Sequence, residues 1–371
     1  MSTKQLRLTL SALVTVAILA FASVQTTHAQ SLGTGTFQPK FAKYMTLHPN
    51  ARQLATARHS HLLTTIPFWS SLFTFQGNEY PYQMVGTDPT TGSGTTVVPT
   101  ELIGLKLTFA DGFVLDGSTK LKPTLNSPIF SKADFKSGHT QYGDAIQRAE
   151  FWTYVQKYSK RYHVLLGHPR VSTISIIVPA QNGLHVKTQS GIDVGLIEIN
   201  WFDSVLQGIM AAKQISPSTF PIFLDYNAFL YIGNPSQCCI LGYHSALPFN
   251  KPNGASAIQT YAFAAYADPG LSSPNFTVSD ILPLSHEVSE WYNDPFTDNM
   301  VPPWPIPSAP QVCSSFLEVG DPVAGVAFEV NGYHPEDEVF FSWFARQVPS
   351  LGIDGLYTYL GTFNTVPPVC Q

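Results

Sequence analysis

The sequence predicts an α+β protein, in which a mixed sheet, a backing helix and a further polar helix follow a β-rich N-terminal portion. Runs of β-branched and aromatic residues separated by turn-forming residues indicate strands within residues 30–140. Residues 141–371 instead alternate helical periodicity with short apolar runs. We therefore divide the chain into three segments, 1–29, 30–140 and 141–371.

The first segment has the pattern of a secretory signal peptide. Lys4 and Arg7 precede an apolar run over residues 8–22, and Ala29 ends a stretch suited to cleavage. No later run reaches the roughly 18 consecutive apolar residues that a membrane-spanning helix needs. We expect a secreted or periplasmic protein with no membrane span after cleavage.

The composition excludes several classes of function. Charged residues make up 12% of the chain, the formal net charge is −5, and lysine and arginine do not cluster. Because nucleic-acid binding depends on phosphate neutralisation, we expect no nucleic-acid partner. The sequence also lacks the glycine-rich motifs of serine hydrolases, phosphate-binding loops and dinucleotide-binding proteins.

The four cysteines predict disulfide bonds in an exported protein. They are Cys238, Cys239, Cys313 and Cys370. Because adjacent cysteines bond each other only with strain, we expect Cys238 and Cys239 to bond separately to Cys313 and Cys370. Either of the two possible pairings fits the sequence.

The elements expected along the chain follow in order. "TTVVPTELIGLKLTF" at residues 95–109 predicts strands. "DAIQRAEFWTYVQKYSKRY" predicts a helix, and "RVSTISIIVP" at 170–179 predicts a strand. Apolar residues at helical spacing predict a second helix over Trp201–Lys213. Apolar runs at 220–232 and 257–267 predict further strands.

The last predicted helix lies around "LSHEVSEWYNDPF". Asp280 suits its N-cap, and Pro283 is tolerated in the first turn. An apolar stripe is formed by Ile281, Leu284, Val288 and Trp291. At about 100° per residue, His286 and Glu290 lie together on the opposite side, with Glu287 beside them.

This pattern suits a metal centre. Side chains at i and i+4 can bind one ion, and the residue after the histidine can take a proton from water, as in H-E-x-x-H zinc hydrolases. In this chain Glu290 stands where that motif has its second histidine. The alternative is a solvent-exposed helix face that carries two acids and a histidine.

The order of strands, backing helix, edge strand and motif helix resembles that of the zincin metallopeptidases. The resemblance implies a zincin-like domain over residues 141–371, of an H-E-x-x-E variety. It makes His286 and Glu290 metal ligands and Glu287 the general base.

The third ligand is expected downstream, in "LEVGDP". We favour Glu318 over Asp321, because an aspartate between glycine and proline is also a natural turn former. His334 and the upstream His244 are further candidates.

A second resemblance covers roughly Cys238–Pro322. "SHEVSEWYNDPF", preceded by "CCILGYHSA" and followed by "FLEVGDPV", is similar to a segment of secreted proteins related to the plant phosphate-induced or Exordium-like family. It implies an extracellular protein with a zincin-like site, without implying a particular reaction.

The ligand types leave zinc and calcium as candidate metals. One imidazole and two carboxylates neutralise a divalent ion and weaken it as a Lewis acid, and oxygen ligands suit calcium, manganese or magnesium. Asp294, Asp298 and Asn299 could bind calcium instead, although a polar turn after the helix is the simpler interpretation.

The acidic run "PEDE" at residues 335–338 predicts the start of a helix rather than a catalytic cluster. Pro335 suits the first helical position, and three acids complement the positive end of the helix dipole. We therefore interpret His334 as a neighbour of the N-cap.

The sequence thus predicts a secreted metal-dependent hydrolase, specifically a zinc metallopeptidase with a peptide or protein substrate. The alternative is a non-enzymatic extracellular binding or structural protein, with a vestigial or calcium-loaded site and an extracellular polymer as partner.

Overall fold

The computed structural model describes residues 53, 54, 57, 63–158, 161–250, 256–271 and 278–370. The predicted signal peptide, residues 1–29, lies outside them. The described chain is a mixed α+β structure with several open sheets. No helix among these residues is long and apolar enough to cross a membrane.

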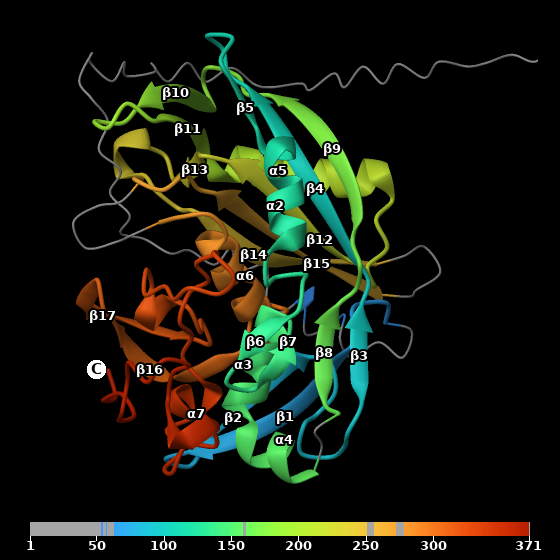
Figure 1. Ribbon diagram of the computed structural model, residues 1–371, viewed down its shortest axis with the longest axis vertical. Helices are drawn as coiled ribbons and strands as arrows, with labels where there is room; N and C mark the ends of the chain where they lie inside the picture. The colour runs from blue at the N-terminus through green and yellow to red at the C-terminus, as the bar shows by residue number, and fades with distance from the viewer. Residues whose placement is uncertain are drawn as a thin grey trace, which may run out of the picture. The chain divides into compact units, whose positions relative to one another are not determined.

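The largest sheet has the strand order β14-β15-β12-β4-β5, with β9 also paired to β4 (Figure 1). β4, β9, β12 and β15 run parallel to their neighbours in this group, whereas β14 and β5 are antiparallel. Its strands are β4 Thr100–Thr108, β5 Val114–Asp116, β9 Arg170–Ile177, β12 Phe220–Tyr226, β14 Gly242–Asn250 and β15 Ser256–Tyr266. Because β4 pairs with both β9 and β12, the sheet joins residues on both sides of position 140.

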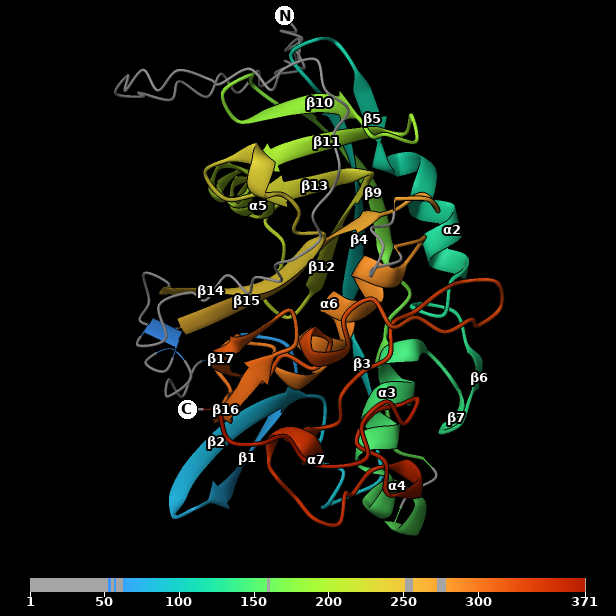
Figure 2. The ribbon, with the colours of Figure 1, turned by 90° about the vertical axis from the view of Figure 1, so that its left-hand side faces the viewer.

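Helices cover both faces of this sheet. α5 (Ile199–Lys213) packs its apolar side with alternate residues of β4 and β12, such as Ile103 and Phe223. α6 (Leu282–Asn293) packs with the intervening residues, such as Leu102 and Ile222. Because both faces are covered, β4, β12 and β15 are almost continuously buried. Figure 2 shows α5 and α6 on the two sides of the strands.

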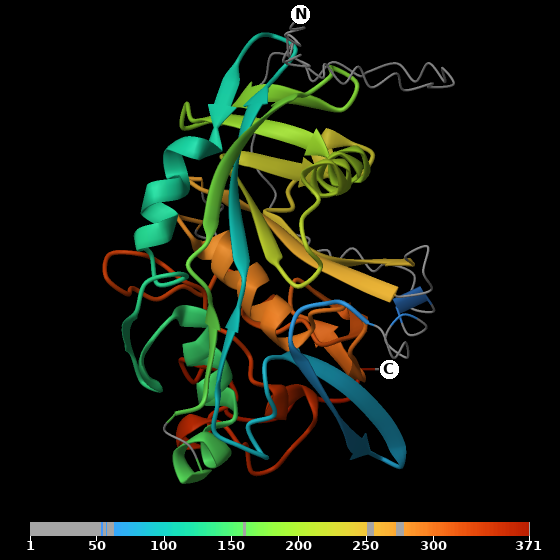
Figure 3. The ribbon, with the colours of Figure 1, turned by 90° about the vertical axis from the view of Figure 1, so that its right-hand side faces the viewer.

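Smaller sheets surround this core. The hairpin β1 Phe68–Phe75 and β2 Asn78–Val85, blue in Figure 3, turns at Gln76 and Gly77, both with positive φ, and β2 contacts α6. The other strands are β3 Thr95–Val98, β6 Ala133–Phe135, β7 Gly138–Thr140, β8 His163–Leu166, β10 Gly183–Lys187, β11 Asp193–Glu198, β13 Ala228–Tyr231, β16 Met300–Ile306 and β17 Ala309–Phe316. The other α-helices are α2 Leu121–Asn126, α3 Tyr142–Glu150, α4 Trp152–Tyr158 and α7 Phe341–Phe344.

The structure corrects three local predictions. The helix expected over residues 144–162 is divided at Phe151 into α3 and α4. α6 begins at Leu282, and Asp280, with φ 37°, precedes the capping position. "PEDE" does not open a helix. Within residues 335–338 Glu336 forms an isolated bridge to Ala327, and the helix that follows is confined to Phe341–Phe344.

The disulfide prediction is also wrong in its pairing. Cys313 bonds Cys370, with a Cα–Cα distance of 5.8 Å, and this bond ties β17 to the end of the chain. Cys238 instead lies against its neighbour Cys239. Neither of these two adjacent cysteines therefore reaches Cys313 or Cys370.

Candidate metal centre

The helix that carries the motif is buried on every side. Leu284, Val288 and Trp291 pack into the main core, where the Trp291 ring stacks on Phe220 with 3.6 Å between centroids. All twelve residues of α6 are buried, including His286, Glu287 and Glu290. The alternative of a solvent-exposed polar face is therefore wrong, because β14 and the C-terminal segment cover that side.

His286 lies between three carboxylates. Its Nε2 is 3.2 Å from Glu290 Oε1 and 3.7 Å from Asp321 Oδ1. Its Nδ1 lies 2.5 Å from Glu336 Oε2. Because an ionised carboxylate only accepts hydrogen bonds, Glu336 holds the proton on Nδ1 and turns Nε2 toward Glu290 and Asp321.

Backbone contact fixes the position of this histidine. A Cβ atom on Gly320 would lie 2.2 Å from His286 Nδ1, so only glycine fits beside the ring. The Gly320 N–H also donates to Glu290 Oε1 at 3.3 Å. Gly320 thus brings the backbone that carries Asp321 directly against the motif helix.

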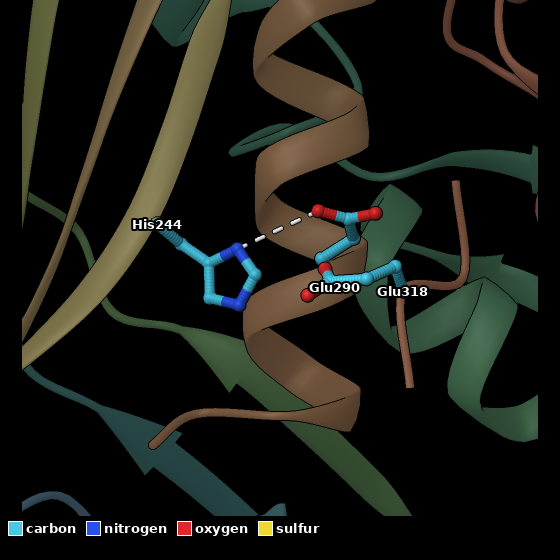
Figure 4. A group of neighbouring side chains, drawn as sticks. All are labelled: His244, Glu290 and Glu318. Atoms are coloured by element: carbon cyan, nitrogen blue, oxygen red, sulfur yellow. Dashed lines mark ion pairs between the residues drawn. The ribbon is translucent and has the colours of Figure 1, made fainter. Parts of the chain in front are cut away.

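A second group of ligand-type residues shares Glu290. His244 of β14 is fully buried, and its Nδ1 lies 3.5 Å from Glu290 Oε2 and 3.4 Å from Glu287 Oε2. Figure 4 shows the carboxylates of Glu290 and Glu318 on the side of the His244 ring that carries its nitrogens. Glu287 also packs against β14, where a Cβ on Gly242 would lie 2.7 Å from its Cγ.

Two sets of three residues thus bring possible ligand atoms together. His286, Glu290 and Asp321 form one set, and His244, Glu290 and Glu318 form the other, with the ligand atoms of each set within 4.8 Å of one another. Both downstream candidates therefore reach Glu290. His334 does not join either set, because its Nδ1 contacts Asp280 Oδ2 at 2.7 Å.

Burial and charge set the protonation of these groups. Burial raises the pKa values of Glu318 and Asp321 well above their usual range, and the charge of Glu290 adds to this effect. Burial acts the same way on Glu290, but His286 and His244 outweigh it and lower its pKa. Burial alone would lower the pKa values of His244 and His286, yet the surrounding carboxylates raise both well above 6.5.

The residues fit a divalent cation. His244 Nε2 and Asp321 Oδ1 are buried atoms with no hydrogen-bond partner among the described residues. Ligand atoms about 2.0–2.2 Å from a tetrahedral metal lie roughly 3.3–3.6 Å apart. The 3.2 Å contact between Glu290 Oε1 and His286 Nε2 is close to that spacing. Each set offers one nitrogen and two oxygen ligands, a combination suited to zinc or manganese.

The other candidate calcium site, at Asp294, Asp298 and Asn299, is a hydrogen-bonded turn. The Asp294 carboxylate accepts the backbone N–H groups of Asp298 at 3.0 Å and Asn299 at 3.1 Å. The Asn299 amide in turn donates to the carbonyl oxygens of Gln83 and Asn293. These hydrogen bonds stabilise the turn that follows α6, as the polar-turn interpretation predicts.

Sequence reasoning missed Glu336, which orients His286, and its neighbour Glu338, which accepts a hydrogen bond from Tyr142 Oη at 2.8 Å. Both lie in the "PEDE" run that was assigned to a helix start. One signal was available, because no lysine or arginine occurs between residues 331 and 345 to neutralise these acids.

Comparisons with known proteins found no significant match to this chain. No protein-family description matches the chain. No curated protein and no solved structure is significantly similar to it. The zincin and Exordium-like resemblances therefore rest on the sequence motifs and the order of elements.

Proposed function

We propose that this protein is a metal-dependent hydrolase that holds a divalent ion between His286, Glu290 and Asp321. The observation that carries the proposal is the convergence of these three ligand atoms within 4.8 Å, with His286 held by Glu336. A histidine whose second ring nitrogen is fixed by a carboxylate is the usual form of a metal-ligating imidazole.

Each neighbouring side chain has a role in this proposal. When bound, the ion would polarise a substrate carbonyl and lower the pKa of a water molecule. Glu287, next to His286 on the same helix, would act as the general base that accepts a proton from water. His244 holds the Glu287 carboxylate in place through the 3.4 Å contact between Nδ1 and Oε2.

The order of elements supports the zincin-like part of the proposal. β9, α5 and β12 precede the antiparallel edge strand β14, and β15 leads to α6. This is the sequence of strands, backing helix, edge strand and active-site helix on which the resemblance rests. We accordingly propose zinc as the ion and a peptide as the substrate class.

A second candidate is a non-enzymatic protein in which the ion is structural. It is favoured by the enclosure of the site, because the side chains of His286 and Glu287 are 3% and 6% exposed. Asp321, whose side chain is 16% exposed, is the most open ligand, so a substrate would have to approach from its side.

The first experiment measures metal in the purified protein by elemental mass spectrometry, for wild type, His286→Ala and the control His334→Ala. Zinc that is lost only in His286→Ala supports the site. Purified wild-type protein without zinc would contradict the proposal. The second experiment tests hydrolysis of a fluorogenic peptide library by wild type and Glu287→Gln. Activity lost in Glu287→Gln with metal retained supports the hydrolase, whereas metal without activity in wild type supports the structural role.

A further inference from the structure

Glu290 turns its two carboxylate oxygens to different histidines. Oε1 lies 3.2 Å from His286 Nε2, on the side of Asp321, and Oε2 lies 3.5 Å from His244 Nδ1, on the side of Glu318. A carboxylate that offers one oxygen to each of two cations bridges them, and such pairs in two-metal hydrolases lie about 3.5–4 Å apart.

We propose that a second divalent cation binds between His244, Glu290 and Glu318, with Glu290 bridging it to the ion of the proposed hydrolytic site. This proposal rests on the proposed function only through Glu290, because its other two ligands belong to β14 and to the segment after β17. The two sets have the same composition, one imidazole and two carboxylates, so both should take the same class of ion.

The environment of His244 supports this site independently. Its side chain is fully buried, and its Nε2 has no hydrogen-bond partner within the described part of the chain. A buried nitrogen without a partner is unfavourable, and a cation bound at Nε2 would supply that partner. In Figure 4 the nitrogen-bearing side of the ring faces the carboxylates of Glu290 and Glu318.

The carboxylates around His244 and His286 also favour the binding of more than one cation. Five carboxylates gather around the two histidines, namely Glu287, Glu290, Glu318, Asp321 and Glu336. Glu287, Glu290, Asp321 and Glu336 form ion pairs with His244 or His286. A cation in each set would lie beside two carboxylates, with Glu290 shared between the two sets.

The test uses the purified protein, stripped with a chelator and reloaded with MnCl₂. Bound manganese is counted by elemental mass spectrometry, and the electron paramagnetic resonance spectrum reports whether the ions are magnetically coupled. We expect two ions per chain with a coupled spectrum in wild type. Glu318→Gln, His244→Ala and His286→Ala should each retain one uncoupled ion, and the control Glu150→Gln, a buried carboxylate elsewhere, should retain both.

Three results would overturn the proposal and can be told apart. One uncoupled ion in wild type that only His286→Ala removes leaves the hydrolytic site intact and excludes the second one. One ion that only His244→Ala and Glu318→Gln remove excludes the bridge and the proposed hydrolytic site. No bound manganese excludes both sites. The wild-type count and spectrum decide the matter even if a variant fails to fold.

Discussion

Gly320 lies so close to His286 that any side chain at residue 320 would collide with the imidazole, since a Cβ atom would lie 2.2 Å from Nδ1. The contact joins the motif helix to the segment that carries Glu318 and Asp321. The geometry of the candidate centre therefore depends on the absence of one methyl group.

We predict that Gly320→Ala displaces the His286 ring, lowers the metal content and destabilises the fold by about 1–3 kcal/mol, as overpacking of a core does. Thermal unfolding and elemental analysis would measure both effects. Gly208→Ala is the matched control, because nothing lies within 4 Å of the added Cβ in α5. That control should be neutral or slightly stabilising, since alanine favours helix. Normal metal content in Gly320→Ala would contradict the predicted crowding.

Glu336→Gln should weaken metal binding without removing it. The carboxylate lies 2.5 Å from His286 Nδ1, and loss of such an orienting partner typically costs about 10–100-fold in metal affinity. Competition with a zinc chelator would measure the dissociation constant. Glu329→Gln, which changes an exposed acid in the same segment, is the control. Equal dissociation constants in the two variants would show that Glu336 does not orient the ligand.

Glu150 should make stability depend on pH. Burial raises its pKa well above 4.5, and the Phe341 N–H offsets only part of this effect. As pH rises above 4.5, the unfolded chain releases this proton while the folded chain keeps it, so the free energy of unfolding falls until the folded pKa is passed.

Glu150→Gln removes this dependence and should stabilise the protein at pH 8, with the difference from wild type shrinking toward pH 4. Urea unfolding at several pH values would measure it, with Glu79→Gln, an exposed acid of β2, as the control. A difference between wild type and Glu150→Gln that stays constant with pH would refute the shifted pKa.

Loss of the Cys313–Cys370 disulfide should destabilise the fold. The bond closes a loop with a sequence separation of 57, for which chain entropy alone gives about 4 kcal/mol. The double variant Cys313→Ser and Cys370→Ser should therefore unfold at lower denaturant concentration than wild type. A midpoint unchanged by the substitutions, or by a reducing agent, would count against the pairing.

Local periodicity was enough to predict α5 and the motif helix. The spacing of Phe202, Leu206 and Met210 reports directly on the buried face of α5. The i, i+4 spacing of His286 and Glu290 likewise follows from helix geometry alone. The role of Glu336 did not follow, because it depends on a contact across 50 residues of sequence.

The same limit explains the error at residues 335–338. Proline followed by acids is a strong local signal for a helix start, yet here tertiary contacts outweigh it. Glu336 bridges to Ala327 and hydrogen-bonds His286, while the Asp337 carboxylate accepts the Leu360 N–H. Pairing of the cysteines also depended on long-range geometry, which residue count could not supply.

The Cys313–Cys370 bond encloses Glu318, Asp321 and Glu336 in one covalent ring. The ring holds the acidic segment near the helix whether or not an ion is bound, so in the proposed metalloprotein disulfide formation would precede ion uptake. Protein produced under reducing conditions would begin with that segment untethered, and its ion uptake would then report on the redox history of the sample.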